Sequence, residues 1–148
     1  MFGETLETIM EIQAQQNQPE VLPKILIFLV DAILKLKGYK TEGIFRVPGD
    51  IEQVSDLRNR IEKGNFDLSG IKDPHVPSSL LKLWLRELAE PLIPTNKYAL
   101  CISVGREEGE SKQEHLRKAI AIIESLPGTF LKKLMNDRNQ PECDLLCH

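Results

Sequence analysis

The chain has 148 residues, the length of about one domain, and its 41% hydrophobic and 28% charged residues are typical of a globular protein and exclude general disorder. With 19 Lys and Arg against 22 Asp and Glu, the formal net charge is −3, which leaves no overall positive field for binding nucleic acid. The longest apolar run, residues 25–34, is interrupted by Asp31 and is too short to cross a bilayer, and no basic start of a signal peptide precedes it.

Helical periodicity between glycines and prolines predicts an all-α fold. We expect helices at about residues 5–15, 21–37, 50–64, 77–89, from 95 onward, 111–126 and 129–135. The second of these is apolar on almost every side, which is typical of a central buried helix. Asp50 before Gln53, and Ser111 before Glu114, have the spacing of N-terminal helix caps. Only residues 43–47 have an extended pattern, and this segment is too short for a sheet.

The loop at residues 41–50, with the sequence Thr-Glu-Gly-Ile-Phe-Arg-Val-Pro-Gly-Asp, is the most unusual segment. Its apolar members are Ile44, Phe45 and Val47, which we expect to anchor the loop to the core. Arg46 would then project outward, and a planar, permanently charged guanidinium suits the binding of an anion. The alternative is an ordinary surface arginine in a weak ion pair with Glu42.

Lys82 and Arg86 lie four residues apart and therefore share one flank of the predicted helix. Their spacing alone is compatible with two interpretations, a basic contact surface or a solvated helix flank near Glu87 and Glu90. The chain has no glycine-rich phosphate loop, no paired metal-ligand spacing and no nucleophile-elbow motif, so no catalytic centre of its own is predicted.

Cysteine usage favours a reducing compartment, and we expect the protein to be cytoplasmic. The 3 cysteines are Cys101, Cys143 and Cys147, an odd and small number that argues against a disulfide framework. Cys143, Cys147 and His148 lie close together but lack a fourth ligand at a familiar spacing, so we expect no metal site.

Four blocks of sequence resemble the RhoGAP domain family, in order and in approximate spacing, over about residues 1–127. The blocks are Phe-Gly at 2–3, Leu-Pro-Lys-Ile at 22–25, Thr-Glu-Gly-Ile-Phe-Arg at 41–46 and Leu-Lys-Leu-Trp-Leu-Arg-Glu-Leu-Ala-Glu-Pro-Leu at 81–92. Ala89 stands where the family usually has proline, a change that we expect to affect helix termination more than function.

The resemblance implies an all-helical GTPase-activating module for Rho-family small GTPases in their GTP-bound state. In this family an arginine finger, here Arg46, enters the nucleotide site of the partner in trans. Lys82 matches a basic residue that contacts the GTPase, and Arg86 matches one that braces the finger loop through backbone carbonyls. Glu42 and Gly43 match loop-shaping positions. The partner holds GTP and Mg²⁺, so the chain needs no cofactor and is an enzyme activator rather than an enzyme.

The family pattern normally continues through further helices after residue 127, and nothing in residues 128–148 matches them. We therefore expect a C-terminally truncated domain at 1–127 followed by a divergent tail at 128–148, with apolar surface exposed on the central helix. This departure leaves two alternatives to the activator. One is an interaction module that binds Rho-family GTPases without accelerating hydrolysis, and the other is a helical scaffold unrelated to GTPases.

Overall fold

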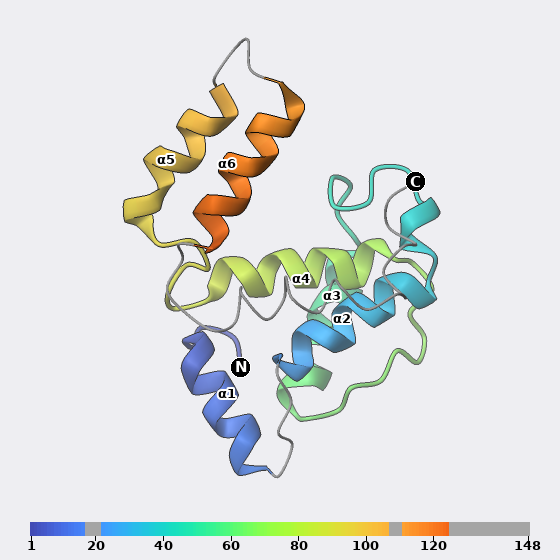
Figure 1. The fold of residues 1–148 in the computed structure, drawn as a ribbon. Helices are drawn as coiled ribbons and strands as arrows, with labels where there is room; N and C mark the ends of the chain where they lie inside the picture. Colours follow the sequence, from blue (N-terminus) through green and yellow to red (C-terminus); the bar gives the residue numbers. More distant parts are fainter. Residues whose placement is uncertain (17–21, 107–110, 125–148) are drawn as a thin grey trace. The chain divides into compact units, whose positions relative to one another are not determined.

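The computed structural model describes residues 1–16, 22–106 and 111–124. Within these ranges the regular elements are six α-helices and one short 3-10 turn, with no strand, and the all-α prediction is confirmed (Figure 1). The chain divides into two compact units, Met1–Glu90 and Pro91–His148. The predicted helix at 129–135, the predicted boundary after residue 127 and the residues Cys143, Cys147 and His148 lie outside the described ranges.

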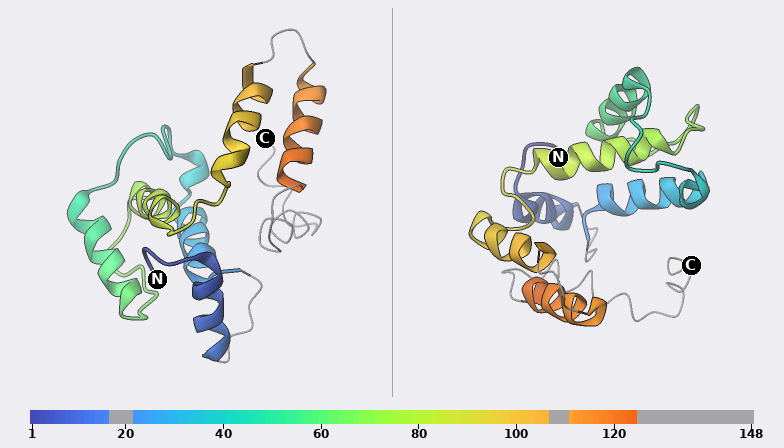
Figure 2. Two further views of the ribbon diagram at one scale, coloured as in Figure 1. Left: turned by 90° about the vertical axis from the view of Figure 1, so that its left-hand side faces the viewer. Right: turned by 90° about the horizontal axis from the view of Figure 1, so that it is seen from above.

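The first unit is built around one central helix. Its elements are α1 (Leu6–Gln15), α2 (Lys24–Lys35), η1 (Gly38–Lys40), α3 (Ile51–Glu62) and α4 (His75–Glu87). Helix α4 lies between α2 and α3 and packs against both, as the two views of Figure 2 show. The side chains at the centre of this core are fully buried: Ile25, Leu29, Leu57, Ile61, Leu80 and Trp84. Helix α4 is therefore the central buried helix of this unit.

Burial of α2 is confined to one side, so the prediction that this helix is the central buried one is only partly right. Leu29 and Ala32 are inaccessible, whereas Val30 and Leu34 are about 40% exposed (39% and 41%). The reason is that residues one or two positions apart point to different sides of a helix, and α4 covers only one of them. Exposed apolar surface on this helix is thus observed within the described residues.

Local capping chemistry explains where several helices begin. The Asp50 carboxylate accepts a 2.9 Å hydrogen bond from the backbone N–H of Gln53, so the predicted cap of α3 is confirmed. Thr5 caps α1 in the same way, accepting from the N–H of Thr8 at 3.1 Å.

Helix α4 begins and ends about two residues earlier than its predicted range of 77–89. Pro77 occupies the third helical position rather than the first. The N–H groups of the first helical turn have no partner within the helix, so a proline at the third position costs no hydrogen bond either. At the other end, Leu88 adopts an extended conformation, and the N–H of Ala89 donates to the Glu4 carbonyl at 3.1 Å instead of continuing the helix.

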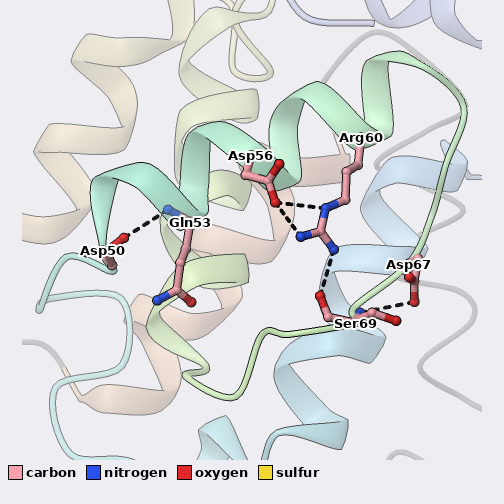
Figure 3. A network of polar contacts seen from close by, with 6 residues as sticks. All are labelled: Asp50, Gln53, Asp56, Arg60, Asp67 and Ser69. Atoms are coloured by element: carbon pink, nitrogen blue, oxygen red, sulfur yellow. Dashed lines mark hydrogen bonds and ion pairs between the residues drawn. The ribbon is translucent and has the colours of Figure 1, made fainter.

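A polar network fixes the connection from α3 to α4 (Figure 3). The Arg60 guanidinium binds the Asp56 carboxylate one turn earlier, at 2.9 Å from its Nε, and donates to the Ser69 carbonyl at 2.7 Å. The Ser69 N–H in turn donates to Asp67 at 3.1 Å. Hydrogen bonds from Ser69 lower the pKa of the Asp67 carboxyl below its ordinary value. Arg60 thereby links the segment between α3 and α4 to Asp56 on α3.

The second unit contains α5 (Thr95–Arg106) and α6 (Lys112–Glu124), which pack against each other. The predicted cap of α6 is confirmed, because the Ser111 hydroxyl accepts a 3.3 Å hydrogen bond from the N–H of Glu114. Helix α5 bears the exposed apolar residues Tyr98 and Leu100. In neither unit is any helix of the described ranges long and apolar enough to cross a membrane.

Candidate functional site

The 41–50 loop connects η1 to α3 and is a series of turns rather than the extended segment predicted for residues 43–47. The N–H groups of Arg46 and Val47 both donate to the Gly43 carbonyl, at 2.8 and 2.9 Å. Two residues of the loop are left-handed, Gly43 with a φ of 71° and Phe45 with a φ of 67°. Left-handed residues interrupt an extended backbone, which is why residues 41–47 form turns and no strand.

Glycine at position 43 is required by both conformation and space. A β-carbon there would lie 2.9 Å from Cγ2 of Val47 and 3.3 Å from Nη2 of Arg46. The φ of 71° is also one that side chains of L-residues rarely adopt. The Arg46 guanidinium therefore lies close over the backbone of Gly43, and only glycine leaves room for it.

The apolar residues of the 41–50 loop do not all anchor it as predicted. Ile44 packs against the core, but Phe45 is 48% exposed and Val47 is 40% exposed. The prediction of three anchoring side chains is therefore wrong for Phe45, whose backbone is left-handed, and for Val47. Ile44 alone of the three holds the loop through apolar contact.

Two polar contacts join the 41–50 loop to α4. The N–H of Gly49 donates to the hydroxyl of Ser79 at 2.9 Å, and the Lys82 ammonium donates to the Phe45 carbonyl at 2.5 Å. The backbone of Gly49 also lies directly against α4, since a β-carbon there would be 2.6 Å from the carbonyl oxygen of His75. The loop is therefore mounted on one face of α4.

Helical spacing places Arg86 on that same face of α4, one turn beyond Lys82. Its side chain is exposed and, among the described residues, makes no hydrogen bond to the 41–50 loop. The resemblance assigned loop bracing to Arg86 and partner contact to Lys82, whereas in this structure Lys82 makes the bond to the loop. The roles of both residues toward a partner stay predictions.

Arg46 is exposed, and within the described part of the chain no ion pair reaches its guanidinium. The alternative prediction, a surface arginine in an ion pair with Glu42, is therefore not met among the described residues. Arg46, Lys82 and Arg86 together form a cationic surface over the 41–50 loop and α4. Such a surface suits a negatively charged ligand or partner.

Glu87, the nearest acid to Arg86 in sequence, is engaged elsewhere by Arg58 of α3. The Arg58 guanidinium lies 2.9 Å from the Glu87 carboxylate and 3.3 Å from that of Glu62, and it stacks 4.4 Å from the centre of the Phe2 ring. Burial disfavours the charged form of Arg58, but the hydrogen bonds of Glu87 and Glu62 outweigh it and raise the pKa of the guanidinium.

Sequence reasoning identified neither the Arg58–Glu87 pair nor Ser79 as part of this region. The sequence places Arg58 directly after the apolar residue Leu57, which by itself signals no ion pair. As to metals, the described residues contain no group of three or more His, Cys, Asp or Glu side chains placed to hold an ion.

Comparison with known proteins places the chain in a family. The model of the RhoGAP domain matches residues 23–135, which is most of the chain, and extends past residue 127, where the resemblance was taken to end. The chain is 38% identical over 127 residues to GTPase activating protein homolog 3 of Dictyostelium discoideum, covering 86% of this chain and 9% of that protein. It is 33% identical over 130 residues to human Rho GTPase-activating protein 24, covering 86% and 17%.

A solved structure agrees in fold. The chain resembles the crystal structure of human Rho GTPase activating protein 15 with a TM-score of 0.68 and 23% identity, over 85% of this chain and 57% of that one. The chain belongs to the RhoGAP family. It spans only a small part, 9–17%, of the length of the two relatives named above.

Proposed function

We propose that this chain stimulates GTP hydrolysis by Rho-family small GTPases and that Arg46 is the arginine finger it supplies in trans. The observation that carries the proposal is an exposed guanidinium on a loop fastened to α4, with Lys82 and Arg86 beside it and no internal ion pair in the described ranges. Membership of the RhoGAP family supports the choice of partner.

The chemistry asked of Arg46 is electrostatic. Negative charge spreads over the oxygens of the γ-phosphoryl group as it is transferred, and a planar guanidinium donating two hydrogen bonds stabilises that charge. An arginine supplied in this way accelerates hydrolysis on the order of 10³–10⁵-fold. The GTPase holds GTP and Mg²⁺ and carries out the hydrolysis, so the chain acts as an activator and brings no cofactor of its own. Its scarcity of cysteines suits action in the reducing cytoplasm.

The remaining site residues shape the 41–50 loop around Arg46 or contact the partner. Gly43 gives the Arg46 side chain its room, and Glu42 lies on the same turn. The exposed cations Lys82 and Arg86 present donors to the acidic surface of a GTPase in its GTP-bound state.

Single-turnover hydrolysis tests the proposal. Each member of a panel of Rho-family GTPases is loaded with GTP and mixed with wild-type chain, Arg46→Ala or Arg46→Lys. We expect acceleration by wild type only, because the single ammonium of lysine cannot reproduce the planar pair of donors. Acceleration by Arg46→Ala equal to that by wild type would refute the role of Arg46.

A binding measurement on the same panel separates activation from association. If the chain binds the GTP-bound form and leaves the hydrolysis rate unchanged, it is an interaction module rather than an activator. Lys82→Glu is the matched variant for this measurement, since it reverses one charge of the cationic surface. Failure to bind any member of the panel would reject both functions.

A further inference from the structure

We propose that the 34–40 segment, which comprises the end of α2 and η1, docks on a membrane surface that contains anionic phospholipids. The exposed side chains of this segment are all cationic or apolar: Leu34, Lys35, Lys37, Tyr39 and Lys40. The proposal does not depend on the role of Arg46, and it is tested without a GTPase.

Charge distinguishes the 34–40 segment from the chain as a whole. The segment contains three lysines and no acidic residue, whereas the net charge of the chain is −3. The nearest acids in the sequence are Asp31 and Glu42, and among the described residues neither forms an ion pair with these lysines. The three ammonium groups are therefore available to the negative potential of a bilayer that carries anionic headgroups.

Apolar side chains stand beside these charges. Leu34 is 41% exposed and Tyr39 is 57% exposed, and Nζ of Lys40 lies 5.6 Å from the centre of the Tyr39 ring. At a membrane interface such apolar groups enter the headgroup region, while the ammonium groups beside them stay in water. Lysines also act as compact point charges, whereas binding of a protein carboxylate in a fixed geometry favours arginine. The mixture of side chains therefore favours a bilayer over an acidic protein.

The backbone of Lys37 indicates that its side chain is there for a function. Its φ of 58° lies in the left-handed region, where glycine is the favoured residue at the end of a helix. In this chain the glycine stands one position later, because a β-carbon on Gly38 would lie 2.6 Å from Cγ2 of Ile33. Lys37 thus keeps an exposed ammonium group at a conformational cost, and strain of this kind is typical of functional positions.

The 34–40 segment is ordered by its own hydrogen bonds. The N–H of Lys37 donates to the Leu34 carbonyl, and the Lys37 carbonyl accepts from the N–H of Lys40, both at 2.9 Å. The hydroxyl of Thr41 donates to the same carbonyl of Lys37 at 3.4 Å. The backbone that carries the lysines is therefore fixed before any contact, which lowers the entropic cost of binding a surface.

Co-sedimentation of the full chain with vesicles tests the proposal. The vesicles consist of phosphatidylcholine alone or of phosphatidylcholine mixed with phosphatidylserine. We expect wild type to bind only the vesicles with phosphatidylserine, and to bind them more weakly as salt is added. The double variant Lys37→Gln with Lys40→Gln should bind these vesicles about fivefold more weakly for each lysine removed. The matched control, Lys63→Gln with Lys72→Gln, removes two exposed lysines outside the segment and should bind like wild type.

Lys37→Gly distinguishes the loss of a contact from the loss of the fold. Glycine removes the ammonium group and also suits the left-handed backbone. We therefore expect vesicle binding about fivefold weaker than that of wild type from a variant at least as stable to urea. A lysine that served only to stabilise the C-terminal end of α2 would give lower stability and unchanged vesicle binding.

The proposal is overturned if wild type binds both kinds of vesicle equally or binds neither. It is also overturned if the Lys63 and Lys72 control loses as much vesicle binding as the Lys37 and Lys40 variant. If wild type binds no vesicles and the Lys37 and Lys40 variant has a lower affinity for a GTPase, the 34–40 segment belongs to a protein interface instead.

Discussion

The backbone N–H of Gly49 and the hydroxyl of Ser79 lie 2.9 Å apart and join the end of the 41–50 loop to the first turns of α4. Around this bond the two backbones are in direct contact, because a β-carbon on Gly49 would meet the carbonyl oxygen of His75 at 2.6 Å. The close approach of loop and helix depends on the absence of a side chain at position 49.

Substitution of Gly49 by alanine should therefore separate the loop from α4. We expect Gly49→Ala to lower the free energy of unfolding by about 1–3 kcal/mol, since rigid backbone atoms must move to admit the methyl group. Ser79→Ala removes only the hydrogen bond and should cost about 1 kcal/mol. Urea unfolding of both variants checks that Gly49→Ala is the more destabilising of the two. A Gly49→Ala variant as stable as wild type would contradict the close packing of loop and helix.

Gly43→Ala should reduce activation of a GTPase more than it reduces stability. The new methyl group would lie 3.3 Å from Nη2 of Arg46 and displace the guanidinium. Gly70→Ala is the matched control, because Gly70 has a φ of 83° with no atom within 4 Å of the added carbon. Both variants should lose roughly 1–2 kcal/mol of stability from the left-handed backbone. Only Gly43→Ala should slow single-turnover hydrolysis, and equal activity of the two would argue against the role of Gly43.

Arg58 should couple energetically to Glu87. We expect Arg58→Met to destabilise the fold by about 1 kcal/mol, because it removes the ion pair and the contact with the Phe2 ring. A double-mutant cycle with Glu87→Gln should give a coupling free energy of about 0.5–1 kcal/mol that decreases with added salt. Additive effects of the two substitutions would mean that the pair contributes nothing to stability.

Acid should remove the stabilising effect of Asp67. The hydrogen bonds from Ser69 lower the pKa of its carboxyl from the ordinary value of 3.8, so its contribution is present above pH 3.8 and is lost as the pH falls through the lower, folded value. Wild type should unfold at a slightly higher urea concentration than Asp67→Asn at neutral pH. That difference should shrink below pH 3.8. Asp31→Asn, at an exposed position on α2, is the control. A stability difference between wild type and Asp67→Asn that grows as the pH falls would contradict the stabilising role of the Asp67 carboxylate.

Features that depend on nearby residues were predictable from the sequence. The caps at Asp50 and Ser111 require only a side chain and an N–H three residues later, and both are present. The start of α4 was misplaced because Pro77 resembles a first helical residue, although the third position tolerates it equally well. The all-α fold followed from periodicity along the whole chain.

Contacts between distant residues were not predictable in the same way. Lys82 and Phe45 are separated by 37 positions, and their hydrogen bond exists only because α4 passes beneath the loop. Phe45 has a left-handed φ, for which an aromatic residue gives no sequence signal, and its side chain is exposed. A prediction based only on the apolar character of Phe45 and Val47 therefore places them wrongly in the core.

Attachment of the 41–50 loop to α4 has a consequence for the thermodynamics of association. Because Gly49 and the Phe45 carbonyl are tethered to the same rigid helix, the conformational entropy of that backbone is lost when the chain folds. An encounter with a partner then orders exposed side chains, that of Arg46 among them, rather than this backbone. Less of the intrinsic interaction free energy is spent on immobilisation, and more of it is left to favour the reacting geometry.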